Sequence, residues 1–231
     1  MGFDLDTIAY TVSVWTIPIL LAVTLHEAAH GWVAMKLGDP TAKVLGRVTF
    51  NPFKHIDPMG TVIIPALLLL ASGGRMMFGF AKPVPVDFGR LKNPRRDMIL
   101  VAAAGPGMNL ALAIICAASF HLAVMLDGDA RDWVAHNLGN ALWINLLLAV
   151  FNMIPLPPLD GGRVAVGLLP WSMARHLVKL EKAGIFIVLG AIFLLPWIGG
   201  KMGLDLNVFR WLVVTPTAHL QELILTLVGL R

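Results

Sequence analysis

The stretch IPILLAVTLHEAAHGWVAMKL, residues 17–37, decides how this 231-residue chain folds. It is apolar almost throughout and long enough to cross a lipid bilayer, which takes about 20 residues of α-helix. Its middle nevertheless holds His26, Glu27 and His30. An ionisable side chain near the centre of a membrane helix costs roughly 2.5–3.5 kcal/mol on insertion scales, so these groups need partners.

The spacing of these polar residues indicates a metal ion. Positions i and i+4 of an α-helix lie on the same face, so the imidazoles of His26 and His30 can reach one ion together. His-Glu-x-x-His is the pattern of zinc hydrolases, in which the glutamate takes a proton from a metal-bound water. We therefore predict His26 and His30 as zinc ligands and Glu27 as the general base.

The composition predicts a polytopic membrane protein rather than a soluble one. The chain is 57% hydrophobic and 14% charged, with a mean hydropathy of +0.76, whereas soluble domains carry about 25% charged residues. The net charge of +4 could indicate nucleic-acid binding. The basic residues lie mostly between apolar runs, however, so membrane topology accounts for them and no nucleic-acid partner is expected. No linker separates a second domain, so residues 1–231 are expected to form one.

The apolar runs predict an all-α fold with five to six transmembrane helices. Five spans are expected at about residues 8–37, 98–126, 138–155, 183–198 and 208–227. The short run at 61–72 is either a sixth span or a re-entrant segment. The positive-inside rule favours re-entry, because a crossing would place two basic connections on opposite sides of the membrane. This topology puts the N-terminus outside and Arg231 inside.

A short β segment is expected directly after the first span. KVLGRVTF, residues 43–50, is rich in β-branched residues and ends at an Asn-Pro turn. At 1.5 Å per residue, His26 lies roughly 15 Å from the Lys36 end of the first span. The predicted metal site is therefore inside the bilayer, nearer the basic side.

A third zinc ligand is expected from a distant segment. Two histidines leave a tetrahedral zinc one protein ligand short if water takes the fourth position. Among ionisable residues at membrane depth the best candidate is Asp160, in Pro-Leu-Pro-Pro-Leu-Asp-Gly-Gly. The prolines block a regular helix, and irregular backbone at this depth is tolerated only where it is buried or lines a cavity. A broken helix of this kind could present one carboxylate inward.

The two motifs together resemble the site-2 protease family of intramembrane zinc metalloproteases. His-Glu-Ala-Ala-His on one span and FNMIPLPPLDGG (151–162) on a later one carry the resemblance, which is strongest to compact bacterial and archaeal members without PDZ or CBS domains. GRVTFNPFKHIDPMG, AKPVPV and NPRRDMILVAAAGP also resemble that subgroup. The resemblance covers residues of about 20–165. It implies a catalytic core at about 8–168 and two additional C-terminal helices at about 183–228.

The resemblance also implies roles for individual residues. His26, His30 and Asp160 would bind Zn²⁺, Glu27 would be the general base, and Asn152 would stabilise the oxyanion. Gly105-Pro106 matches a glycine- and proline-containing motif on the family's middle span, and KVLGRVTF would pair with an extended substrate backbone. The expected partners are a transmembrane protein substrate and membrane lipids. The expected location is the cytoplasmic membrane of a prokaryote, with the active site toward the cytoplasm.

Several readings stay open at this point. Asn152 could instead cap its helix, and Asn109 is either an interhelical hydrogen-bonding residue or a polar group behind the metal ligands. His55 is expected at a surface or interface. A metal-ion transporter would need ionisable residues strung across the membrane and an inverted repeat, and neither is evident. A non-cleaving pseudoprotease would not need the intact Glu27.

Overall fold

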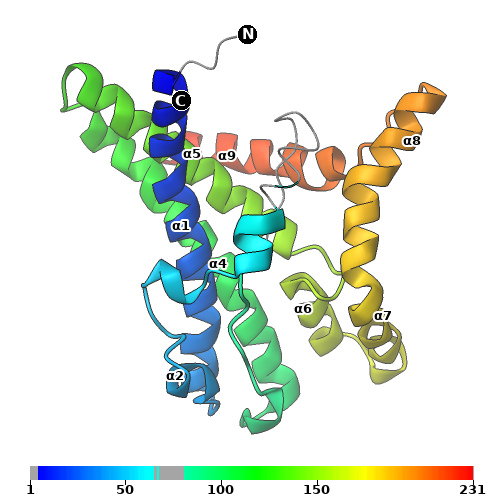
Figure 1. Cartoon of the computed structure of the whole chain (residues 1–231). Helices are drawn as coiled ribbons and strands as arrows, with labels where there is room; N and C mark the ends of the chain where they lie inside the picture. The colour runs from blue at the N-terminus through cyan, green and yellow to red at the C-terminus, as the bar shows by residue number, and fades with distance from the viewer. Residues whose placement is uncertain (1–4, 65–66, 68–80, 231) are drawn as a thin grey trace.

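The regular secondary structure is all helical in the residues that the computed structural model describes, which are 5–64, 67 and 81–230 (Figure 1). Short 3₁₀ or π-helical segments, labelled η, lie between some of the α-helices. In chain order the elements are α1 (Leu5–Lys36), α2 (Thr41–Val44), η1 (Pro52–Lys54), η2 (Pro58–Ile63), η3 (Phe88–Arg90), α4 (Pro94–Ala123), α5 (Gly128–Asn152), α6 (Asp160–Leu168), α7 (Trp171–Leu189), η4 (Gly190–Leu194), α8 (Leu195–Met202), η5 (Arg210–Val214) and α9 (Thr215–Leu227).

Four helices of the described chain are long and apolar enough to cross a membrane. They are 9–36 within α1, the whole of α4, the whole of α5, and the continuous helix 171–202 formed by α7, η4 and α8. Large apolar side chains on their outer faces are exposed, among them Leu21, Ile115 and Phe186. Such faces suit contact with lipid, which supports an integral membrane protein.

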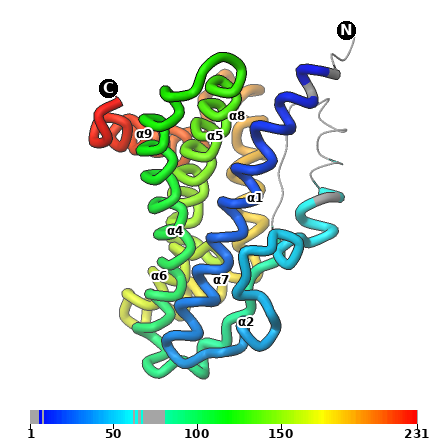
Figure 2. The backbone as a smooth tube through the Cα atoms, turned by 90° about the vertical axis from the view of Figure 1, so that its left-hand side faces the viewer, coloured from blue at the N-terminus to red at the C-terminus, as the bar shows by residue number. Residues whose placement is uncertain are grey.

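The helices α1, α4 and α5 form a three-helix core (Figures 1 and 2). α4 packs against both α1 and α5, and a cluster of buried apolar side chains joins it to α5 and α9. On α4 this cluster consists of Ala113 and Ala117, which face Leu142 and Leu146 of α5 and Ile224 of α9. Small residues at such contacts let membrane helices approach closely, so α4 can serve as the common support of the fold.

Tryptophan–lysine pairs mark the ends of the membrane-crossing region. Lys36 Nζ lies 5.6 Å from the ring centroid of Trp32 at the end of α1. Lys201 Nζ lies 3.9 Å from the ring centroid of Trp197 in α8, at the opposite end of the molecule in Figure 1. Tryptophan and lysine favour the two membrane–water interfaces. We call the end near Lys36, where α4 also begins, the basic end.

The prediction of a fifth span at 208–227 is wrong. The continuous helix of η5 and α9 runs across the three-helix core near the end where α1 begins (Figures 1 and 2). Polar residues in its middle, including His219, Gln221 and Glu222, make it a poor membrane span. The Val228 carbonyl is hydrogen-bonded to His121 at the end of α4. The last described residues therefore do not return to the basic end, contrary to the predicted topology.

The predicted β segment at Lys43–Phe50 is also wrong. Lys43 and Val44 belong to α2, Gly46 adopts a left-handed conformation with φ of 64°, and the Arg47 N–H donates to the Ala42 carbonyl at 2.8 Å. The segment turns back on itself because Gly46 reverses the chain and no described strand lies beside it. Most of the short run at 61–72 lies outside the described residues, and the span predicted at 183–198 is part of the longer helix 171–202.

A buried carboxylate holds together the connection between α1 and α4. Asp39 is fully buried and accepts hydrogen bonds from the N–H and hydroxyl of Thr41 and from the Asp87 N–H, the last at 2.7 Å. Burial alone would raise the pKa of the Asp39 carboxyl, but these hydrogen bonds outweigh it and hold the pKa below its ordinary value. Asp39 thus fixes the turn after α1 to the segment that leads into α4.

Asp39→Asn should lower the thermal unfolding temperature of the detergent-solubilised protein. The change places an amide N–H₂ against backbone donors, and lost hydrogen bonds to a buried charge cost roughly 1.5–3 kcal/mol. A loss of that size corresponds to a fall in Tm of roughly 3–12 °C for a chain of this length. Asp132→Asn, at an exposed position in α5, is the matched control and should change Tm little. Equal Tm values for the two variants would contradict the role given to Asp39.

The effect should also depend on pH in a defined direction. A carboxyl whose pKa is depressed on folding contributes stability above its unfolded pKa, and loses that contribution as the pH falls. The difference in Tm between wild type and Asp39→Asn should therefore be complete at neutral pH and shrink below the ordinary value of 3.8. A difference that grows on acidification would mean that the sign of the pKa shift is wrong.

Candidate metal centre

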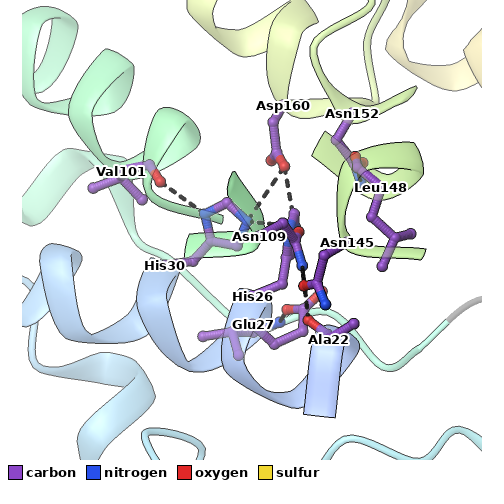
Figure 3. Close-up of polar contacts among 11 residues, drawn as sticks. Ala22, His26, Glu27, His30, Val101, Asn109, Asn145, Leu148, Asn152 and Asp160 are labelled. Atoms are coloured by element: carbon purple, nitrogen blue, oxygen red, sulfur yellow. Dashed lines mark hydrogen bonds and ion pairs between the residues drawn. The ribbon is translucent and has the colours of Figure 1, made fainter. Parts of the chain in front are cut away.

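Three donor atoms converge between α1 and the start of α6 (Figure 3). His26 Nε2 and His30 Nε2 lie 3.0 Å apart, and they lie 3.2 and 3.3 Å from Asp160 Oδ2. Ligands of a tetrahedral zinc at the usual bond lengths of about 2.0–2.2 Å lie about 3.3 Å from one another. The spacing and the donor types of this triangle therefore fit one zinc ion, with a corner of the tetrahedron left over for water.

Hydrogen bonds on the far side of each imidazole fix which nitrogen faces the triangle. Nδ1 of His26 lies 2.6 Å from Asn109 Oδ1, and Nδ1 of His30 lies 2.7 Å from the Val101 carbonyl oxygen. Both partners accept, so each Nδ1 carries the proton and each Nε2 keeps a free lone pair. This is the tautomer that a metal ligand needs, and both partners belong to α4.

Asn109 has no freedom to turn away from His26. It is completely buried, and its Nδ2 donates to the Ala22 carbonyl at 3.1 Å and to Asn145 Oδ1 at 2.8 Å. Its Oδ1 is left to face the imidazole. Both of the roles left open for Asn109 are therefore present in the structure, since it joins three helices and also orients His26. Asn145 lies behind it and donates to the Ala141 carbonyl.

Gly105 leaves open the space beside the two imidazole nitrogens. A Cβ atom built at this position would lie 2.3 Å from His30 Nε2 and 2.6 Å from His26 Nε2. No side chain fits there without displacing the donors. The glycine of the Gly105-Pro106 pair is therefore explained by its contact with the histidines as well as by helix packing.

The break between α5 and α6 sets the position of Asp160. α5 ends at Asn152, and Asp160 is the first residue of α6. A Cβ at Gly161 would lie 2.3 Å from the Met153 carbonyl carbon, and one at Gly162 would lie 2.2 Å from the Pro157 nitrogen. The proline-rich loop thus folds tightly onto the first turn of α6. The prediction of a broken helix that presents an inward carboxylate is confirmed.

Glu27 lies next to His26 but outside the donor triangle. Its Oε2 accepts a hydrogen bond from the Val84 N–H at 2.7 Å. Prolines occupy positions 83 and 85, so Val84 supplies the one N–H of this tripeptide. The Arg47 guanidinium donates to the Lys82 carbonyl at 2.7 Å and holds the same extended segment. Sequence reasoning missed this contact, although the Pro-Val-Pro pattern is visible.

Asn152 and His55 are not part of the donor triangle. Asn152 Nδ2 donates to the Leu148 carbonyl at 3.0 Å within its own helix, and its predicted contact with an oxyanion stays a prediction. His55 is buried rather than at a surface, with Nε2 3.2 Å from the Thr49 carbonyl oxygen. Its own carbonyl accepts from the Lys82 N–H at 2.9 Å, which joins the 49–55 loop to the segment that reaches Glu27.

A set of membrane-crossing helices that brings two histidines and a carboxylate together defines a membrane protein with a candidate metal-binding site. Comparison with known families assigns it further. The model of "Peptidase family M50" matches residues 14–128 and 121–197. The chain belongs to this family, which is that of the site-2 proteases.

Two similar proteins are each named "Putative zinc metalloprotease". YwhC of Bacillus subtilis (strain 168) is 41% identical over 187 residues, which cover 78% of this chain and 80% of YwhC. Rip2 of Mycobacterium tuberculosis (strain ATCC 25618 / H37Rv) is 31% identical over 182 residues, which cover 78% of this chain and 66% of Rip2. No solved structure matches the chain significantly.

Gly105→Ala should abolish metal binding without unfolding the protein. The new methyl group would lie within 2.6 Å of both imidazole nitrogens, whereas a Cβ at Gly107 of the same helix meets nothing within 4 Å. Gly107→Ala is therefore the matched control and should keep its metal. Elemental analysis of purified protein measures the difference, and circular dichroism checks the helix content. Full metal content in Gly105→Ala would contradict the placement of the ion beside Gly105.

Proposed function

We propose that this chain is an intramembrane zinc metalloprotease that hydrolyses a peptide bond in or near the transmembrane segment of a membrane protein. The donor triangle of His26, His30 and Asp160 carries the proposal, because it lies beside Glu27 on a membrane-crossing helix. Membership of the M50 family and the names of the relatives support zinc as the metal and peptide hydrolysis as the reaction.

The residues of the site divide the reaction between them. A zinc ion held by the triangle would supply Lewis acidity, which lowers the pKa of a water to about 7 and polarises the scissile carbonyl. Glu27 takes a proton from the attacking water as the new C–O bond forms. It passes that proton to the leaving nitrogen as the C–N bond breaks. Asn152 uses one N–H of its amide on Leu148, and the other can donate to the developing oxyanion.

The surroundings of the site favour a membrane-bound substrate reached from the cytoplasm. Basic residues, including Lys36, Lys92 and Arg96, gather at the basic end, which the positive-inside rule assigns to the cytoplasm. His26 lies roughly 15 Å from Lys36 along α1, so water reaches the site most directly from that side. A substrate helix must unwind locally, because its carbonyls are otherwise bonded within the helix. A prokaryotic cytoplasmic membrane is the proposed location.

Glu27→Gln should keep zinc and lose cleavage. Removing a general base costs about 10²–10⁴ in rate, whereas the donor triangle does not include Glu27. Purified wild type, Glu27→Gln and Asp160→Ala are compared by elemental analysis for zinc. Each is then incubated with casein and with a lysine-flanked apolar 25-residue peptide in detergent, and new N-termini are identified by mass spectrometry. Wild type should hold about one zinc, and Asp160→Ala should lose it.

Other outcomes would separate the competing functions. Cleavage retained by Glu27→Gln would remove Glu27 as the base. Zinc retained in full by Asp160→Ala would remove Asp160 from the metal. A wild type that binds zinc but cuts neither of the two test substrates nor a co-expressed single-span protein would favour the pseudoprotease. Transport of zinc into liposomes that contain the protein would favour the transporter.

Val84→Pro should slow cleavage by about tenfold and leave zinc content unchanged. The substitution removes the N–H that holds Glu27, and a hydrogen bond to a charged group contributes roughly 1.5–3 kcal/mol. Proline suits the extended backbone of this segment. Val84→Ala keeps the N–H and is the matched control for the lost side chain. Equal rates for the two variants would show that the hydrogen bond does not orient the base.

A further inference from the structure

Arg95, in the first turn of α4, binds the C-terminal end of α6. Its Nε donates to the Gly167 carbonyl at 2.9 Å, and its Nη2 donates to the Leu169 carbonyl. The last carbonyls of a helix have no donors within the helix, and a cation there also interacts favourably with the helix dipole. The planar guanidinium can serve two such carbonyls at once, so Arg95 joins α6 to α4 at a defined register.

A close backbone approach fixes the same end of α6. A Cβ at Gly167 would lie 2.4 Å from Ile99 Cγ1 and 3.2 Å from the Arg95 carbonyl oxygen. Gly167 is buried in this contact, and Ile99 lies one turn along α4 from Arg95. Together the two contacts leave α6 little freedom to slide or rotate on α4.

The other end of α6 carries Asp160. The helix has nine residues and is roughly 13 Å long, so a shift at one end moves the other end as part of a rigid body. A metal site needs its ligands within about 0.5 Å of their places. The two histidines are oriented from α4 as well, through Val101 and Asn109. A fixed register of α6 on α4 therefore determines whether all three donors meet.

We propose that Arg95 is a positioning residue of the metal centre, which sets the reach of the Asp160 carboxylate by holding the far end of α6. The inference rests on the zinc site of the proposed function. The hydrogen bonds of Arg95 go to α6 and the residue after it rather than to the three donors, so Arg95 acts on the metal centre through α6. The neighbouring Arg96 has the same charge at the same membrane end, and among the described residues the structure gives it no hydrogen bond or ion pair.

The test compares Arg95→Ala, Arg95→Lys, Arg96→Ala and Asp160→Ala with wild type in detergent. Zinc affinity is measured by competition with a chromophoric chelator, and the visible spectrum of the cobalt-substituted protein reports the ligand set. Arg95→Ala should bind zinc about tenfold more weakly, and its cobalt spectrum should move toward that of Asp160→Ala. Arg95→Lys should fall between, because an ammonium cannot serve both carbonyls as a fork does. Arg96→Ala should match wild type.

The cobalt spectrum separates positioning from a loss of general stability. A variant that is only less stable keeps the wild-type spectrum in its folded fraction, whereas a displaced Asp160 changes it. Wild-type affinity and spectrum in Arg95→Ala would overturn the proposal. If that variant does not fold, a wild-type spectrum in Arg95→Lys would do the same. If instead Asp160→Ala binds zinc as wild type does, the metal centre itself is misassigned, and that result is distinct from a failure of Arg95.

Discussion

The structure depends on one requirement, that two imidazoles buried at membrane depth have a partner for each of their nitrogens. A histidine in a membrane span is tolerated only when its polar atoms are satisfied by protein, a metal or enclosed water. α4 meets half of this requirement with the Val101 carbonyl and the Asn109 side chain. The proline-broken segment after α5 brings the Asp160 carboxylate to both Nε2 atoms, where one cation would satisfy all three acceptors. The three-helix core and α6 are arranged around that requirement.

Glycine makes this convergence sterically feasible. Gly105 leaves room beside the imidazoles, Gly161 lets the loop fold onto α6, and Gly167 lets α6 lie on α4. Each glycine lacks a side chain at a place where its backbone comes within a few ångströms of another backbone or of a neighbouring side chain. The hydrophobic effect does not drive helices together inside lipid, so close van der Waals packing and interhelical hydrogen bonds must do so. Small residues therefore allow the close packing that holds the fold together, and at Gly105 the same smallness leaves open the space beside the imidazole nitrogens.

Features that depend on local spacing could be predicted from the sequence, and features that depend on distant contacts could not. Helical periodicity places His26 and His30 on one face, and the prolines before Asp160 break a helix whatever surrounds it. The prediction of a β segment was wrong because it rested on the β-branched residues and did not consider that Gly46 could reverse the chain. The prediction of a fifth span was wrong because the apolar residues at both ends of 208–227 outweighed the polar residues in its middle. The contacts of Val84 and Arg95 join residues 57 and 72 positions apart, and no local pattern reports them.

The metal donors and the proposed base are held by different parts of the chain, although they are neighbours in sequence. Successive residues of an α-helix point about 100° apart around its axis, so Glu27 and His26 leave α1 in different directions. α4 orients the histidines, while Glu27 meets the extended segment around Val84. Since the prolines on either side of Val84 offer no N–H, the carboxylate has a single backbone donor in that tripeptide. Ligand geometry and base orientation are therefore separable properties of this fold.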